Sequence, residues 1–137
     1  MRYLAIDYGT RHTGLAICDP AETIASPLMV VDGTKGLIEK IAEIVKTEKV
    51  DAVVVGLPLN MDDSRGPQAN LVFEFAERLK EHLEIAIHFQ DERLTTFSAG
   101  ERIASTDALG KKRKKKRRLD AIAAAEILEA FLEQKHT

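Results

Sequence analysis

Four acidic residues in this sequence stand at the borders of apolar segments, where their carboxylates could do chemistry. Asp7 follows the apolar stretch YLAI, Asp91 and Glu92 follow IHFQ, and Asp120 lies near the start of LDAIAAAEILEAFLEQ. Carboxylates from separate segments, with no cluster of His and Cys that would suit zinc, are the hard oxygen ligands that Mg²⁺ and Mn²⁺ prefer. Two such ions about 4 Å apart can activate a water and stabilise the leaving oxygen in phosphodiester hydrolysis. We therefore take Asp7, Glu92 and Asp120 as candidate metal ligands and catalytic residues, with Asp91 as a further catalytic candidate.

Asp120 is the most informative of these residues. On a helical wheel of about 100° per residue it lies within about 40° of Ala124, Ile127 and Phe131, on the centre of the apolar face. A charged carboxylate facing a core is costly unless a cation, a metal or strong donors meet it. The alanines that follow would let this helix lie very close to a sheet and bring Asp120 to the strand ends. Because we expect Asp120 in the first turn of the helix, it could instead cap the helix N-terminus.

The other acidic positions also have ordinary structural explanations. Asp7 could cap the glycine-containing turn that follows it, and Glu92 with Arg93 could form a surface ion pair. Adjacent residues of a strand face opposite sides, so the sequence does not separate Asp91 from Glu92 as the metal ligand. We favour Glu92 and retain both.

The basic residues are concentrated in one run. The chain has 20 Lys and Arg residues, eight of which are consecutive, and this leaves 12 basic against 22 acidic residues elsewhere. An acidic body with a local basic strip is a common way to hold a polyanion at one place, although such a run can also be a solvated linker. We expect nucleic acid to contact this run, and Arg11 and Arg93 are further candidates for phosphate contacts. The run consists of Lys111, Lys112, Arg113, Lys114, Lys115, Lys116, Arg117 and Arg118.

Hydrophobic periodicity predicts the elements that must position these residues. The pattern is that of an α/β protein with a mixed β-sheet flanked by α-helices, and residues 1–137 are expected to form a single domain. The first two strands flank the glycine turn and should form an antiparallel hairpin. Strands are predicted at 2–7, 13–18, 24–31, 50–56 and 85–90, and helices at 35–47, 67–82, 96–104 and 119–134.

Two features of the sequence bear on its location. No apolar run approaches the ~20 residues that a membrane span needs, and the N-terminus lacks the basic flank and long apolar stretch of a signal peptide. The single cysteine, Cys18, cannot form an internal disulfide. We expect a cytoplasmic protein with no membrane partner.

Several segments together resemble one known family. AIDYGTRHTGLAICD, VVVGLPLNMDDSRGPQ, DERLTT and LDAIAAAEILEAFL are similar, in order and spacing, to the signature segments of the YqgF (RuvX-like) family. These are Holliday-junction-resolvase-like bacterial proteins described as nucleases that process the 5′ end of pre-16S rRNA. The resemblance implies an RNase H-like fold, a divalent metal, Mg²⁺ or Mn²⁺, and an association with structured RNA in ribosome precursors. It places Asp7, the DER segment and Asp120 at the family's acidic positions.

Other functions fit part of the same pattern. A resolvase acting on branched DNA would use the same metal chemistry and backbone contacts, and a non-catalytic RNA-binding module would need the basic run alone. The D-x-G-T segment also begins the phosphate segment of actin-like ATPases, but such a nucleotide-binding switch needs a second domain and a second phosphate segment. Gly9 to Gly14 has the spacing of a P-loop without the Lys and Ser or Thr that must follow. The sequence leaves the choice between RNA and DNA, and the oligomeric state, open.

Overall fold

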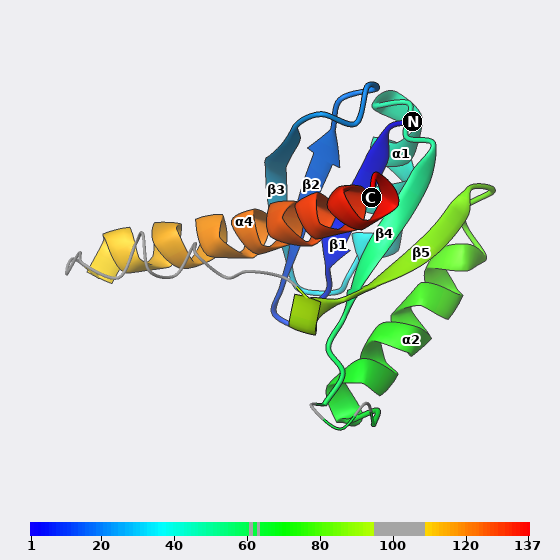
Figure 1. Cartoon of the computed structure of the whole chain (residues 1–137). Coiled ribbons are helices and arrows are strands. Elements are labelled where there is room, and N and C mark those ends of the chain that lie inside the picture. The colour runs from blue at the N-terminus through cyan, green and yellow to red at the C-terminus, as the bar shows by residue number, and fades with distance from the viewer. Residues whose placement is uncertain (61, 63, 95–108) are drawn as a thin grey trace.

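A five-stranded mixed sheet organises the described residues, which are 1–60, 62, 64–94 and 109–137 of the computed structural model (Figure 1). The strand order is β3-β2-β1-β4-β5, in which β1 pairs antiparallel with β2, β2 antiparallel with β3, and β4 parallel with both β1 and β5. The predicted hairpin and the predicted mixed sheet are therefore confirmed. The strands are β1 (Tyr3–Asp7), β2 (His12–Cys18), β3 (Ala25–Asp32), β4 (Ala52–Leu57) and β5 (Ala86–Asp91).

Helices cover both faces of this sheet. The helices α1 (Leu37–Thr47) and α2 (Pro67–Lys80) pack on one face, and α4 (Leu109–Lys135) crosses the other (Figure 1). A short 3₁₀ turn, η1 (Glu92–Leu94), follows β5 directly. The helix predicted at 96–104 lies outside the described residues. Within the part of the chain that is described, no helix is both long and apolar enough to cross a membrane.

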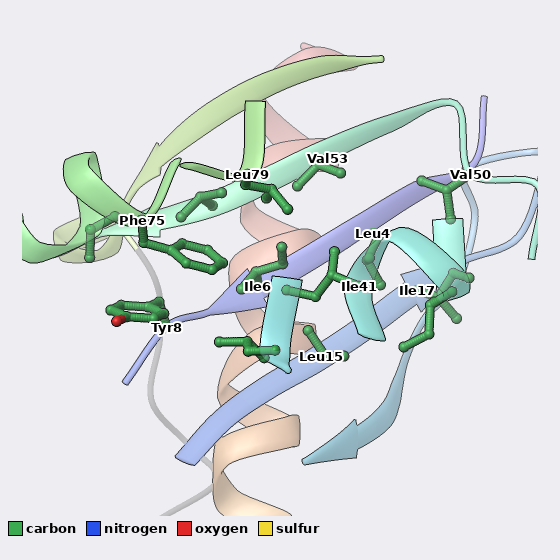
Figure 2. Packing of buried hydrophobic residues seen from close by; sticks show 14 residues of the cluster. Leu4, Ile6, Tyr8, Leu15, Ile17, Ile41, Val50, Val53, Phe75 and Leu79 are labelled. Atoms are coloured by element: carbon green, nitrogen blue, oxygen red, sulfur yellow. The ribbon is translucent and has the colours of Figure 1, made fainter. Parts of the chain in front are cut away.

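The alternation of side chains along β1 divides the molecule into two cores. Leu4 and Ile6 pack with α1 and α2 in the larger cluster that Figure 2 shows, whereas Tyr3 and Ala5 pack against α4. Successive residues of a strand point to opposite faces, so Asp7 follows Tyr3 and Ala5 and lies on the α4 face.

The residue after Asp7 fixes the end of β1 from the opposite side. The Tyr8 ring stacks on Phe75 of α2 with 4.2 Å between the ring centroids (Figure 2). Because Tyr8 is anchored against α2 in this way, the end of β1 cannot rotate freely, and the Asp7 side chain is held toward α4.

The helix α4 lies close to the sheet, as the alanine-rich sequence predicts. Ala124 is fully buried and Ala125 nearly so, and both pack with small residues of the strands such as Ala5 and Ala16. At Gly14 of β2 the approach is closest, since a Cβ atom there would overlap the backbone carbonyl oxygen of Asp120. A glycine at this position is thus a steric requirement of the packing.

The start of α4 differs from the prediction. The helix begins at Leu109 and includes the whole basic run, so residue 119 is not its start and the run is not a linker. Lys and Arg are good helix formers, and hydrophobic periodicity detects only the part of a helix that packs on something. The N-terminal part of α4 extends past the β3 side of the sheet in Figure 1. Asp120 is therefore well inside the helix, and the capping explanation for it is wrong.

Candidate active site

The candidate active site lies on the α4 face of the sheet around Asp7. In the pairing of β1 with β2, Asp7 stands opposite Gly14. On the other side β1 pairs in parallel with β4 through Ile6 and Val55, which puts Gly56 next to Asp7. Asp7 is thus flanked by two glycines on the same face. Because neither has a side chain, the backbone of Asp120 fills the space at Gly14 and the side chain of Glu92 fills the space at Gly56.

Glu92 occupies the room above Gly56. It is the first residue of η1, and its Oε1 lies 2.6 Å from the point where a Cβ of Gly56 would stand. The side chains of Asp7 and Glu92 are hydrogen-bonded to each other. The tight turn that follows β5 therefore brings Glu92 back over β4, into contact with the end of β1.

Burial dominates the electrostatics of this pair. Loss of solvation, followed by the Glu92 charge and hydrogen bond and then by the charge of Asp120, raises the pKa of Asp7 from 3.8 to about 8. Burial also raises the pKa of Glu92. Two adjacent carboxyl groups cannot both ionise cheaply in such surroundings, so the pair titrates as a unit. At neutral pH the metal-free pair retains a proton, with Asp7 donating to the Glu92 carboxylate.

Asp120 approaches the pair from α4. Its backbone carbonyl packs against the Cα of Gly14, the residue opposite Asp7. Its Oδ2 atom is buried from solvent. Its charge is one of the causes of the raised pKa of Asp7. The structure therefore brings together three acidic residues from β1, η1 and α4. Among the described residues, no three His, Cys, Asp or Glu side chains are already spaced as a metal site.

Asp91 lies in a different environment. Its Oδ2 accepts a hydrogen bond of 2.6 Å from Nη2 of Arg93, and its Oδ1 accepts one of 3.0 Å from Nε of the same side chain. These bonds lower the pKa of Asp91. Arg93 also donates from Nη1 to the backbone oxygen of Asn60 at 3.0 Å. The sequence allowed an ion pair of Glu92 with Arg93, but Arg93 pairs with Asp91 instead, and Glu92 is the residue that meets Asp7.

The remaining predicted residues are Arg11 and the basic run. Arg11 is exposed in the turn between β1 and β2. The basic run at 111–118 forms successive turns of α4, of which the structure describes the backbone. Their part in holding a polyanion stays a prediction from the sequence.

Sequence reasoning missed one buried polar residue near the site. Gln90 of β5 is 3% exposed and stands opposite Gly56 in the pairing of β4 with β5. It therefore lies on the α4 face with Asp7 and Glu92. Its position directly before the acidic pair in FQDER could have drawn attention to it, as could Gly56 at the end of the apolar run VVVG, because glycine in a buried strand marks a close approach.

Comparison with solved structures defines the fold class. The chain aligns over 99% of its length with 96% of Thermus thermophilus RuvC at a TM-score of 0.58 and 13% identity. It aligns over 100% of both chains with the Fowlpox virus resolvase in complex with Holliday junction DNA, at a TM-score of 0.60 and 14% identity. The protein thus has the RNase H-like fold of the RuvC-type resolvases, as the sequence predicted.

Sequence comparison then gives the family. Residues 1–134 match the model of the family described as "RuvX: Holliday junction resolvase". A protein of Caldanaerobacter subterraneus is 42% identical over 136 residues, covering 97% of this chain and 96% of its own, and one of Roseiflexus is 40% identical over 134 residues, covering 96% and 94%. Both are named "Putative pre-16S rRNA nuclease". The chain belongs to the RuvX family, which confirms the resemblance found in its sequence segments.

Proposed function

We propose that this protein is a metal-dependent nuclease that hydrolyses phosphodiester bonds in the 5′-end processing of pre-16S rRNA. The observation that carries the proposal is the hydrogen-bonded pair of Asp7 and Glu92, with Asp120 beside it, at the strand ends of an RNase H-like sheet. The names of the relatives, which match nearly the whole chain, supply the substrate.

The donor set fits a hard divalent cation. Asp7, Glu92 and Asp120 offer carboxylate oxygens and no softer ligand, which is the set that Mg²⁺ and Mn²⁺ prefer. The pair keeps a proton because burial removes the water that would stabilise two negative charges. A bound cation would supply positive charge in place of that proton. When bound, such a cation activates water and neutralises charge on the scissile phosphate.

The protein's own residues would contribute positioning. Asp7 is fixed by the anchoring of Tyr8 behind it, and Glu92 is fixed by the turn that Asp91 and Arg93 hold together. Asp120 is carried by a helix that cannot move toward or away from Gly14 without losing its packing. Carboxylates held by three separate elements present a constant geometry, and this is the condition under which metal-assisted hydrolysis is efficient.

The basic part of α4 would hold the nucleic acid. Without the run at 111–118 the chain is strongly acidic, so a polyanion is attracted to one region and repelled elsewhere. Because this region lies on the same helix as Asp120, a backbone that follows α4 is led toward the carboxylates. Ribosome precursors present structured RNA with exposed phosphates, which such a helix would contact.

A cleavage assay with matched variants tests the proposal. RNA that spans the 5′ end of pre-16S rRNA is incubated with the protein in Mg²⁺ or Mn²⁺, and Asp7→Asn and Asp120→Asn are compared with wild type. Each substitution should abolish cleavage and leave RNA binding largely intact, because it disturbs the cation and not the basic helix. Glu77→Gln, an exposed change on α2, serves as the control and should cleave normally. Cleavage that persists in Asp7→Asn would refute the assignment.

A second candidate function is resolution of four-way DNA junctions. It is favoured by the description of the family and by the likeness to resolvases solved with junction DNA. The same assay with a four-way junction in place of RNA separates the two. Symmetric paired cuts in the junction, with the precursor RNA left intact, would favour the resolvase.

A further inference from the structure

Gln90 carries a buried amide that the site as described does not use. The side chain is 3% exposed, and within the described part of the chain its Nε2 has no hydrogen-bond partner. A buried donor left without an acceptor lowers the stability of the folded state, and such groups in folded proteins call for an explanation. When a buried group in a functional site lacks the partner that protein interiors normally provide, the function commonly accounts for it.

The place of Gln90 in the sheet indicates where its acceptor is. Gln90 stands opposite Gly56, and the Glu92 Oε1 lies 2.6 Å from the position of the absent Gly56 Cβ. Neighbouring strands are about 4.8 Å apart, so a carboxyl over Gly56 lies beside the Gln90 side chain on the same face of the sheet. Asp7 flanks Gly56 on its other side. The Glu92 carboxyl is therefore situated between Asp7 and Gln90.

The burial of Gln90 also excludes some acceptors. A donor that solvent does not reach is poorly placed to bind a phosphate group arriving from outside, so its acceptor should be an atom of the protein. The Glu92 carboxyl, which lies over Gly56 beside Gln90, offers such an atom.

We infer that Gln90 is a positioning residue that donates from Nε2 to the Glu92 carboxylate in the cation-loaded site. This inference rests on the proposed function, because it assigns a role within the same site. With one Glu92 oxygen held by the Gln90 amide, the other is directed toward Asp7. Groups that orient a ligand carboxylate in this way typically raise metal affinity by 10-fold to 100-fold.

The test is the substitution Gln90→Met, which keeps the length of the side chain and removes the donor. Two readouts should move in opposite directions. Without metal, in EDTA, the variant should melt about 3–5 °C above wild type, because an unsatisfied buried donor has been removed. Its dissociation constant for Mn²⁺, measured by titration calorimetry without nucleic acid, should rise about 10-fold or more. Gln68→Met, an exposed change on α2, should alter neither.

Three results would overturn the inference. If Gln90→Met binds Mn²⁺ as wild type does, the amide does not act on Glu92. If the variant melts below wild type in EDTA, the amide has a structural partner. If Mn²⁺ affinity is unchanged and the KM for RNA rises, the amide serves the substrate. Gln90→Leu, measured in parallel, gives the same readouts with a second apolar side chain. Wild-type protein that binds no Mn²⁺ and cleaves nothing would instead refute the proposed function itself.

Discussion

Replacing Asp7 by Asn should stabilise the metal-free protein at alkaline pH and leave it almost unchanged at acidic pH. The folded state holds the Asp7 proton up to about pH 8, whereas the unfolded chain loses it near the ordinary pKa of 3.8. The folded state therefore binds more protons than the unfolded state between these values, and wild-type stability falls as the pH rises through this window. Asn carries permanent donors that can bond to Glu92 and has no proton to lose.

The size of the effect follows from the pKa of Asp7. A rise from 3.8 to about 8 corresponds to roughly 6 kcal/mol when the group is fully ionised, at about 1.4 kcal/mol per pKa unit. Because Asp7 retains partial contact with water, which screens the charge, we expect about half of this, or ~3 kcal/mol, above pH 8. For a chain of this length ~3 kcal/mol corresponds to a rise in melting temperature of about 10 °C.

Thermal unfolding followed by circular dichroism in EDTA measures this difference. Wild type and Asp7→Asn are melted at about pH 3, 6 and 9, so that the lowest value lies below the ordinary pKa of Asp7, with Glu77→Gln as the control. The two proteins should melt within about 1 °C of each other at the lowest pH and separate progressively as the pH rises. A difference that is constant across the three values would refute the reasoning, because it would mean that Asp7 ionises freely in the folded state.

Other parts of the structure give further predictions. Gly14→Val should destabilise the protein by about 2–4 kcal/mol in urea unfolding, since its Cβ would force α4 off the sheet, and an unchanged midpoint would contradict that packing. Gly56→Ala should displace the Glu92 carboxyl and reduce cleavage about 100-fold while the fold persists, as circular dichroism can verify. Arg93→Ala should let the pKa of Asp91 rise toward its ordinary value, which carbon-detected NMR titration measures. Changing four bases in the run at 111–118 to Gln should reduce the slope of log affinity against log salt by about 3–4, and an equal slope would show that the run does not contact phosphates.

The strands were predictable because their signals are local. The run VDAVVVG is short, apolar and β-branched, and it forms most of the interior strand β4, which is buried on both faces. The alanines after Asp120 likewise indicated a helix that approaches a sheet closely, and Gly14 is where that approach is tightest.

Other features depend on contacts that a sequence pattern does not contain. The turns of α4 before residue 119 consist mainly of Lys and Arg, so hydrophobic periodicity gave no signal of a helix there. The choice between Asp91 and Glu92 depends on the exact end of β5, because a shift of one residue exchanges the side chains between faces. The part played by Gln90 depends on a glycine in the neighbouring strand, 34 residues earlier in the chain.

The central claim is that the acidic residues around Asp7 form a divalent cation site, and proton release on cation binding tests it most directly. Mn²⁺ is titrated into the protein by calorimetry in buffers of different ionisation enthalpy. With the pKa of Asp7 at about 8, binding at about pH 7 should release close to one proton, and this release should fall toward zero by about pH 10. Asp7→Asn should abolish the release and weaken binding. Binding heats that do not vary with buffer, or Mn²⁺ affinity that is unchanged in Asp7→Asn, would contradict the account.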